Sequence, residues 1–274
     1  MQPQTKPAVK AATAATYDAA ADLFDAPANA FWDRIGRRTV ERIALKRGEH
    51  VLDACCGSGA SAIPAAEAVG ASGRVLGIDL AEKLLGLARA KALRRGLAHA
   101  EFRLGDIEAL NPSTETFDAV ICVFGIFFLP DMMAGVRNLW RLVRPGGRLA
   151  ITTWGGRVFE PGRTAFLQAV RKERSDLYKE SGPWDLISEP SGVAALLRDG
   201  GAPADDILAE SGRQALDAPE DFWTIAMGSG YRGTLEQMDA ATRERVRQAT
   251  VDSLTKQNVR SIETNAIYAI ARKP

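Results

Sequence analysis

The segment LDACCGSGASA, residues 52–62, places Gly57 and Gly59 directly after an apolar run that is typical of a buried strand. Backbone N–H groups in such a turn attract anions, and glycine lets a ligand approach the backbone closely. Asp79 follows about 20 residues later at the end of a second apolar run, where a carboxylate can accept hydrogen bonds from ribose hydroxyls. This spacing predicts a nucleotide site and, taken alone, leaves a dinucleotide-dependent enzyme open.

The cysteines of the chain, Cys55, Cys56 and Cys122, do not form a pattern that predicts thiol or metal chemistry. Zinc sites use cysteines about two to four residues apart together with further ligands, and only His50 and His99 are present. We therefore expect no metal. Three cysteines, two of them adjacent, also make a poor disulfide framework, which favours a reducing cytoplasm. We expect Cys55 and Cys56 to be small spacers in the loop, so that replacing both with Ala spares most cofactor binding.

The elements that position these residues follow from the hydrophobic pattern. Apolar runs alternate with helical periodicity from Glu49 onward, which predicts a parallel sheet covered by helices on both faces. Helices are expected at 81–95 and 131–143, the second with Asp131 as its N-cap. Strands are expected at residues 50–56, 73–80, 100–106, 117–125, 147–154, 207–213 and 264–272.

Two features separate this chain from dinucleotide enzymes. Asp53 lies inside the tip of the first strand, and Asp106 and Ile107 follow the third. Together VLDACCGSG, VLGIDLAEKLL, FRLGDIEAL, FDAVICVFGI and LVRPGGRLAI resemble, in order and spacing, the motifs of class I S-adenosylmethionine-dependent methyltransferases over residues 48–155. The flanks are similar, more loosely, to the small-molecule branch that includes the ubiquinone and menaquinone C-methyltransferases.

The resemblance implies a fold and a cofactor. The fold is α/β, Rossmann-like and doubly wound: a mainly parallel seven-stranded sheet with an antiparallel C-terminal strand and a helical lid. The cofactor is S-adenosylmethionine, with S-adenosylhomocysteine as product. The residues expected to bind it are Asp53, Gly57, Gly59, Asp79, Leu80, Asp106, Ile107, Val123 and Tyr17.

Each of these roles has a structural alternative. Asp53 and Asp79 are also ordinary turn-formers, and Asp106 is also suited to cap a short helix. Tyr17, expected to close over the methionine carboxylate from an N-terminal helix, is equally consistent with a surface helix. The order of all five motifs favours the cofactor interpretation over these separate explanations.

The chain of 274 residues is 46% hydrophobic with a formal charge of +1. We expect a flexible tail over 1–16 and a single methyltransferase domain over 17–274, with the cofactor-binding core at 48–155 and lid and substrate-binding elements at 17–46 and 156–202. Near-zero charge argues against a nucleic-acid partner. Without a run of about 18 apolar residues or a secretory h-region, we expect no membrane insertion and a cytoplasmic protein.

The acceptor site is less determined by the sequence. His50 and His99 precede strands, so they fall at the edge opposite the ligand and are not expected to act as a base. The fourth strand lacks the Asn/Asp-Pro-Pro-aromatic tetrad of amino-directed enzymes. The residues expected to line a pocket for an apolar or aromatic metabolite are Phe124, Phe127, Trp154 and Trp32.

The predicted function is methyl transfer to an O, N or C atom of a small molecule by in-line displacement, in which positioning and desolvation do most of the work. No catalytic residue is assigned, and the oligomeric state stays open. Two other classes also stay open: an NAD(P)-dependent oxidoreductase that uses the same glycine loop, and a non-catalytic binding module on a methyltransferase scaffold.

Overall fold

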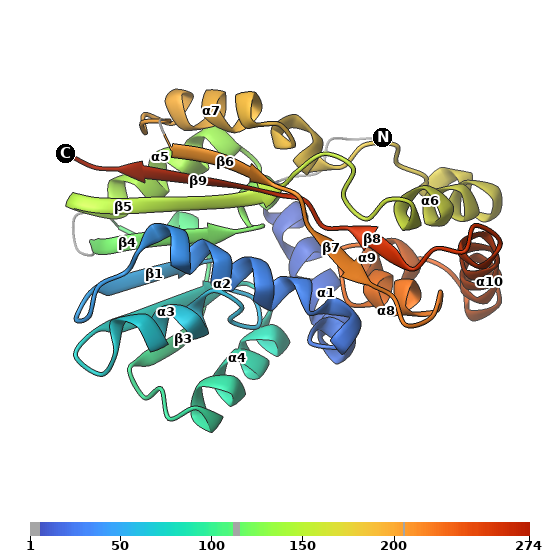
Figure 1. The fold of residues 1–274 in the computed structure, drawn as a ribbon, viewed down its shortest axis with the longest axis horizontal. Coiled ribbons are helices and arrows are strands. Elements are labelled where there is room, and N and C mark those ends of the chain that lie inside the picture. Colours follow the sequence, from blue (N-terminus) through green and yellow to red (C-terminus); the bar gives the residue numbers. More distant parts are fainter. Residues whose placement is uncertain (1–5, 112–115, 205) are drawn as a thin grey trace.

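A computed structural model of the chain describes residues 6–111, 116–204 and 206–274, and a seven-stranded sheet forms its centre (Figure 1). The strand order is β3-β2-β1-β4-β5-β9-β6. β9 is antiparallel to both of its neighbours, while β1 to β5 pair in parallel. The predicted sheet is therefore confirmed. Its strands are β1 (His50–Ala54), β2 (Arg74–Asp79), β3 (Ala100–Leu104), β4 (Phe117–Val123), β5 (Val143–Trp154), β6 (Asp206–Glu210) and β9 (Ala266–Arg272).

Helices cover both faces of the sheet because its side chains alternate between two apolar cores. Val51 and Val75 face one core with α2 (Phe31–Ile43), α3 (Ala62–Val69) and α4 (Glu82–Arg94). Leu52 and Leu76 face the other core with α5 (Met132–Leu142) and α7 (Pro190–Asp199). Buried on both faces, the strands are continuous apolar runs, which is why the sequence pattern located them.

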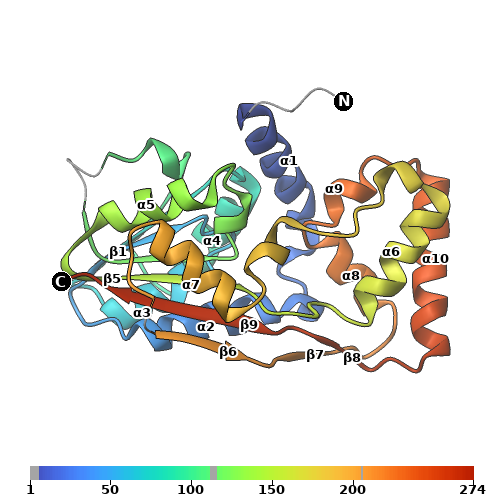
Figure 2. The same cartoon turned by 90° about the horizontal axis from the view of Figure 1, so that it is seen from above.

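A second group of helices lies beyond the sheet edge where the parallel strands end (Figure 2). A short ribbon of two strands leads from the sheet toward this group. The helices are α1 (Lys6–Phe24), α6 (Gly162–Glu173), α8 (Asp221–Met227), α9 (Arg232–Leu235) and α10 (Ala240–Lys256), and the ribbon strands are β7 (Arg213–Ala215) and β8 (Ser261–Glu263). Single 3₁₀ turns are η1 (Pro27–Asn29), η2 (Ile107–Ala109), η3 (Ile126–Phe128), η4 (Ser175–Leu177) and η5 (Pro183–Ile187).

The N-terminal segment differs from the expected flexible tail over 1–16. Residues 1–5 lie outside the described part of the chain, but α1 begins at Lys6. The segment is rich in alanine, which has the highest helix propensity, and the helix packs against α4 and α9. The expectation of a tail was therefore wrong for residues 6–16.

The helices beyond the carboxyl ends of the strands are only in part the ones that the expected lid segments, 17–46 and 156–202, would supply. Within those segments α2 and α7 pack on the faces of the sheet instead. Helices α8, α9 and α10, which lie outside both expected segments, join α1 and α6 beyond the strand ends. Among the described residues, no helix has both the length and the apolar character needed to cross a bilayer.

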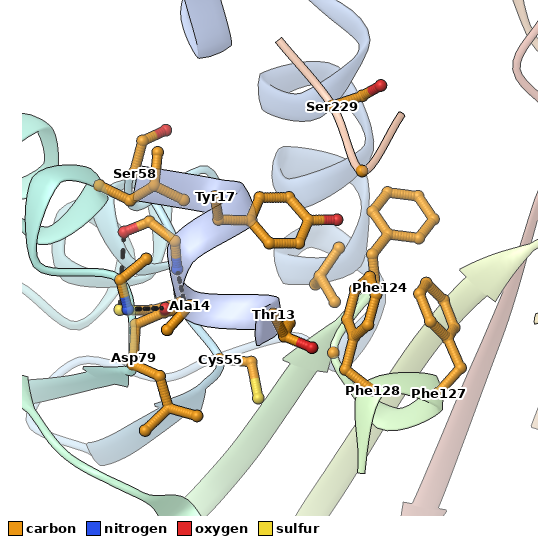
Figure 3. A pocket seen from close by; sticks show the side chains of 18 of the residues that line it. Thr13, Ala14, Tyr17, Cys55, Ser58, Asp79, Phe124, Phe127, Phe128 and Ser229 are labelled. Atoms are coloured by element: carbon orange, nitrogen blue, oxygen red, sulfur yellow. Dashed lines mark hydrogen bonds between the residues drawn. The ribbon is translucent and has the colours of Figure 1, made fainter. Parts of the chain in front are cut away.

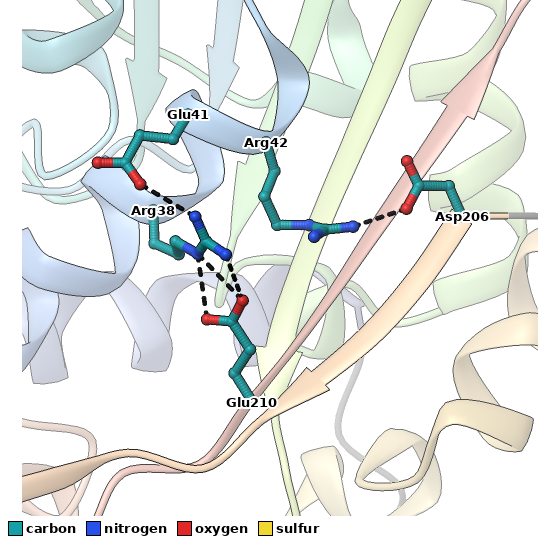
Figure 4. A network of polar contacts seen from close by, with 5 residues as sticks. All are labelled: Arg38, Glu41, Arg42, Asp206 and Glu210. Carbon is teal, nitrogen blue, oxygen red and sulfur yellow. Dashed lines mark hydrogen bonds and ion pairs between the residues drawn. The ribbon is translucent and has the colours of Figure 1, made fainter.

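Polar contacts attach α2 to the edge strand β6 (Figure 4). Arg38 donates through Nε and Nη2 to the Glu210 carboxylate, with the shortest distance 2.6 Å, and its Nη1 reaches Glu41 at 3.2 Å. One turn along the helix, Arg42 Nη2 donates to Asp206 Oδ1 at 2.6 Å. These pairs fix the helix that carries Trp32 against the sheet.

Candidate active site

A cavity lies at the edge of the sheet where the parallel strands end, beneath α1. Its lining comes from the loop after β1, the ends of β2, β4 and β5, the turns η2 and η3, α1, and segments near 158, 184 and 230. Figure 3 shows Asp79 and Ser58 on one side, Phe124, Phe127 and Phe128 on the other, and the Tyr17 ring between them. The cavity therefore has a polar end and an aromatic end.

The loop after β1 needs glycine because its backbone is left-handed. Gly57 and Gly59 have φ of 51° and 85°. A Cβ on Gly59 would also lie 3.2 Å from Ile63 and 3.3 Å from Ala88. Helix α2 approaches the same loop through Gly36, where a Cβ would be 2.4 Å from the carbonyl oxygen of Ala60. Gly57 lines the cavity, whereas Gly59 lies behind it and shapes the turn.

Asp79 ends β2 and holds this loop in place. Its Oδ2 accepts a hydrogen bond from the N–H of Gly57 at 2.8 Å, and its Oδ1 accepts one from the N–H of Ala81 at 2.8 Å. Burial raises the pKa of Asp79, and the backbone hydrogen bonds oppose that rise. Each carboxylate oxygen keeps a further lone pair for a ligand hydroxyl.

Asp53, although predicted to bind the cofactor, is fully buried behind the cavity wall and is not among its lining residues. Its Oδ2 accepts a hydrogen bond from Ser61 Oγ at 2.7 Å. Its Oδ1 has no well-formed partner among the described residues, although the nearby Ala62 amide favours the charged carboxylate. Burial outweighs these contacts and raises the pKa of Asp53 to about 7.

Asp106 and Ile107 both line the cavity at the end of β3. The Asp106 side chain caps η2 by accepting a hydrogen bond from the N–H of Glu108 at 3.0 Å. The alternative role that the sequence suggested for Asp106, as a helix cap, is therefore present. The same carboxylate also pairs with Lys10 of α1 at 2.5 Å, and Lys10 pairs with Glu108 as well. The N-terminal helix thus reaches across to the turn expected to hold a nucleobase.

Tyr17 projects from α1 into the cavity, as Figure 3 shows. Its ring lies edge-on to Phe128 with the centroids 5.4 Å apart, and burial followed by the charge of Asp79 raises the pKa of its hydroxyl. Leu80 and Val123 also line the cavity. Seven of the nine predicted cofactor residues therefore line this cavity, and the other two, Asp53 and Gly59, lie behind its wall.

All four residues predicted for the acceptor pocket line the aromatic end of the cavity. Phe124 stacks on Trp154 with ring centroids 3.8 Å apart, and Trp32 packs against Trp154 at 5.5 Å. Phe127 meets Trp184 at 5.8 Å. These contacts place rings from α2, β5 and two turns around one apolar space.

Two cysteines of this region, Cys55 and Cys56, have thiols with raised pKa values. Cys55 and Cys56 both line the cavity, and Cys122 lies beneath Cys55. The Cys122 thiol and burial raise the pKa of Cys55, and burial raises that of Cys56. Among the described residues, no three His, Cys, Asp or Glu side chains gather as metal ligands would.

A model described as the ubiE/COQ5 methyltransferase family matches residues 5–169. This match covers more than half of the chain and contains α1, the glycine loop, Asp79 and the end of β4. The chain belongs to the ubiE/COQ5 methyltransferase family. The predicted resemblance to class I methyltransferases of the quinone branch is thereby confirmed.

Curated relatives of this ubiE/COQ5 family member match half of its length or less. Nocamycin O-methyltransferase of Saccharothrix syringae is 36% identical over 136 residues, which are 50% of this chain and 49% of that one. Demethylmenaquinone methyltransferase of Anoxybacillus flavithermus is 35% identical over 111 residues, 40% of this chain and 47% of that one. The chain thus spans about half the length of each of these relatives.

A solved structure shares the fold of this ubiE/COQ5 family chain over most of its length. A putative methyltransferase from Bacillus halodurans C-125 superposes with a TM-score of 0.57 at 20% identity, covering 86% of this chain and 97% of that one. At this identity the likeness concerns the fold alone.

The residues at the Asp79 end fit S-adenosylmethionine, the cofactor expected for this family. The free lone pairs of Asp79 suit two ribose hydroxyls, and Leu80 and Ile107 offer apolar surfaces to an adenine ring. The left-handed backbone at Gly57 leaves room for close approach of the methionine part. Carboxylate, apolar surfaces and glycine loop all face one cavity.

Six further cavity residues were not singled out from the sequence. Val158, Phe159 and Trp184 lie in the segment 156–202 that was expected to hold substrate-binding elements, whereas Ser229, Gly230 and Tyr231 lie outside both expected segments. Phe159 and Trp184 belong to a segment rich in aromatics, and Tyr231 follows the run GSG, so an aromatic residue in a Gly/Ser loop was the available signal. His50 and His99 lie away from the cavity, with Nε2 of His99 bonded to the Ala66 carbonyl at 2.9 Å.

Proposed function

We propose that this protein transfers a methyl group from S-adenosylmethionine to a small aromatic or apolar acceptor in this cavity. The proposal rests on the finding that one cavity holds both parts of such a site. Asp79 and the glycine loop line one side of it, and Phe124 and Trp154 line the other. The chain also belongs to a methyltransferase family. Because the chain matches only about half the length of these relatives, we infer the acceptor from the site and not from their names.

The proposed cofactor-binding roles follow the lining residues. Asp79 holds the ribose, Leu80 and Ile107 sandwich the adenine, and Asp106 accepts from the adenine amino group. The Val123 carbonyl receives the ammonium group of the methionine part, and Tyr17 closes over its carboxylate. When bound, the cofactor supplies a methyl group already activated by a sulfonium.

The aromatic end is suited to exclude water and orient the acceptor. Trp32, Phe124 and Trp154 are each less than a tenth exposed, so a ring held among them is desolvated. Holding nucleophile and methyl carbon in line is worth roughly 7 kcal/mol or more of the barrier. Positioning is therefore the main contribution of the chain in this proposal.

Among the described residues, no carboxylate or histidine lines the aromatic end of the cavity. Asp79 and Asp106 are the carboxylate residues of the lining, and both lie at the cofactor end with partners of their own. The proposed acceptor is therefore nucleophilic without help, either as an ionised oxygen or as an electron-rich carbon or nitrogen.

The proposed lid consists of α1 together with the segments around 158, 184 and 230, with the core at 48–155 behind it. A small-molecule partner rather than nucleic acid fits the balanced charge of the chain. We also propose a cytoplasmic location, since the three cysteines are free and lie among buried groups.

The decisive experiment measures binding and transfer with the purified full chain. Calorimetric titrations with S-adenosylhomocysteine and with NADH should show binding of the first alone. Transfer is then followed with S-[methyl-³H]adenosylmethionine and a panel of phenolic, quinol and apolar aromatic acceptors. Binding of NADH without S-adenosylhomocysteine would support an oxidoreductase, and tight S-adenosylhomocysteine binding without transfer to any acceptor would support a non-catalytic module.

A further inference from the structure

The N-terminal helix α1 covers the cavity with one of its sides. Residues three and four positions apart lie on the same side of a helix, and the cavity-lining residues of α1 follow this spacing. They are Lys10, Thr13, Ala14 and Tyr17. A ligand that enters or leaves past this side of the helix requires part of α1 to move.

The first turns of α1 are attached to the rest of the chain by Lys10. Its Nζ pairs with Asp106 at 2.5 Å and also with Glu108, so both of its partners belong to the turn that follows β3. None of the side chains of residues 7–15 is fully buried. Within the described part of the chain, these two ion pairs are therefore the main polar attachment of the first turns.

The other end of α1 is anchored more firmly. Directly after the helix, Asp25 accepts hydrogen bonds from Ser58 Oγ at 2.8 Å and from Lys91 Nζ at 2.7 Å. Ser58 is buried, and the Lys91 side chain is only 13% exposed. Helix α9 also packs closely on α1, because a Cβ on Gly233 would lie 2.4 Å from Thr16 Oγ1. The helix therefore opens most easily at its first turns, since local opening begins where few groups are buried.

Opening of the first turns would uncover the cofactor end of the cavity. Lys10 reaches Asp106, which is expected to contact the adenine, whereas Tyr17 lies two turns later and meets Phe128 at the aromatic end. Movement of the residues before Thr16 thus exposes the surroundings of Asp106 and leaves the Tyr17 ring in place. Both partners of each ion pair belong to the chain, so the pairs resist this movement in the free and in the bound protein alike.

We propose that the ion pairs of Lys10 with Asp106 and Glu108 form a latch that closes the first turns of α1 over the cofactor. S-adenosylmethionine and S-adenosylhomocysteine enter and leave when this latch opens. Lys10 is then a positioning residue that controls the rate of cofactor exchange. The inference rests on the proposed function, because it assigns the path of the cofactor into the same cavity.

The test separates a latch from a direct contact with the ligand. A ligand that passes through an open state associates and dissociates faster when the latch is weakened, so both rate constants rise and Kd changes little. Loss of a direct contact raises the dissociation rate constant alone and raises Kd with it. Stopped-flow mixing of the full chain with S-adenosylhomocysteine, monitored by the fluorescence of the tryptophans that line the cavity, measures both rate constants.

The variants remove the latch in steps. Lys10→Met removes both ion pairs, whereas Glu108→Gln weakens one of them at a residue that does not line the cavity. Partly exposed ion pairs are modest, so both rate constants should rise about 2–10-fold in Lys10→Met and by less in Glu108→Gln. Lys10→Arg, which keeps the charge, should restore rate constants close to those of the wild type. The double variant Lys10→Met/Glu108→Gln should be no faster than Lys10→Met.

The matched control is Lys256→Met, which removes an exposed lysine of α10 outside the cavity lining and should leave both rate constants unchanged. Salt gives a second measurement, because S-adenosylhomocysteine carries no net charge at neutral pH. Raising NaCl from about 0.05 to 0.5 M should speed both steps in the wild type and have little effect in Lys10→Met. Unchanged rate constants in both Lys10→Met and Glu108→Gln would overturn the inference, and so would faster dissociation with unchanged association.

The failure of this inference can be told from failure of the proposed function. The affinity of the wild type for S-adenosylhomocysteine tests the proposed function, and the rate constants of the variants test the latch. A wild type that does not bind S-adenosylhomocysteine would refute the methyltransferase proposal and the latch with it. Binding with rate constants that do not respond to the latch variants would refute only the role of Lys10.

Discussion

Replacement of Asp79 with Ala tests the polar end of the cavity most directly. The carboxylate accepts from the N–H groups of Gly57 and Ala81, both at 2.8 Å, and still has lone pairs for two ribose hydroxyls. The substitution removes the ribose acceptors and also releases the loop amides that the carboxylate orders. Both effects weaken binding of the cofactor product.

The magnitude follows from the charge of the lost acceptor. Charge-assisted hydrogen bonds contribute about 1.5–3 kcal/mol, so the Kd for S-adenosylhomocysteine should rise about 10–150-fold. Released loop amides favour the upper half of that range. Isothermal titration at a temperature well below unfolding measures the change, and thermal unfolding confirms that the variant is folded.

Asp118→Ala is the matched control. Asp118 likewise accepts two hydrogen bonds, from the N–H of His50 at 2.8 Å and from Nε of Arg144 at 2.6 Å, but it does not line the cavity. Its loss should reduce stability and leave the Kd unchanged. An Asp79→Ala affinity within twofold of wild type would show that the ribose is not held here.

Three further perturbations test the supporting structure. Burial raises the pKa of Asp53 to about 7, so between pH 4 and 7 the folded protein keeps a proton that the unfolded chain releases. The free energy of unfolding should therefore fall as the pH rises through this range, by up to about 1.4 kcal/mol per pH unit. Urea unfolding at several pH values should show that slope reduced in Asp53→Asn; equal slopes would refute the assignment. Gly36→Ala should lower both the melting temperature and the affinity for S-adenosylhomocysteine, because the added Cβ would clash with the Ala60 carbonyl of the glycine loop. Gly86→Ala is the control: the space around Gly86 is open, so this change should raise the free energy of unfolding by about 0.5–1 kcal/mol. Glu49→Gln breaks a buried ion pair with Arg148 at 2.6 Å and should lower the free energy of unfolding, measured with urea, by about 3 kcal/mol. Glu210→Gln, which breaks a partly exposed ion pair with Arg38, should lower it by less than about 1 kcal/mol. Similar losses in the two variants would contradict the argument from burial.

The sheet and the polar end of the cavity could be predicted from the sequence because their signals are local. A strand buried on both faces is a short apolar run, and a left-handed turn after it is marked by Gly57 and Gly59. Asp79 lies at the end of the neighbouring strand, so its position follows once the strands are parallel. N-caps such as Asp131, which accepts from the N–H of Ala134 at 2.9 Å, are equally local.

Other features depend on packing between distant segments, which no local pattern records. The alanine-rich segment from Lys6 has no strong amphipathic face. Its place over the cavity depends on distant partners such as Asp106, which pairs with Lys10, 96 residues earlier in the chain. Asp53 has the residue type of a ligand contact but points to Ser61. Tyr231 reaches the cavity only because α8 and α9 pack against α1.

The place of β9 in the sheet has a consequence for synthesis of the protein. Residues 266–272 form the strand between β5 and β6, and they pair with residues 148–154 of β5 and 206–210 of β6. Until the ribosome has released these residues, β5 and β6 each expose an unpaired edge, and such edges promote association between chains. Completion of the sheet therefore waits for residues 266–272, and a nascent chain halted before residue 266 leaves the edge of β5 open to association with other chains.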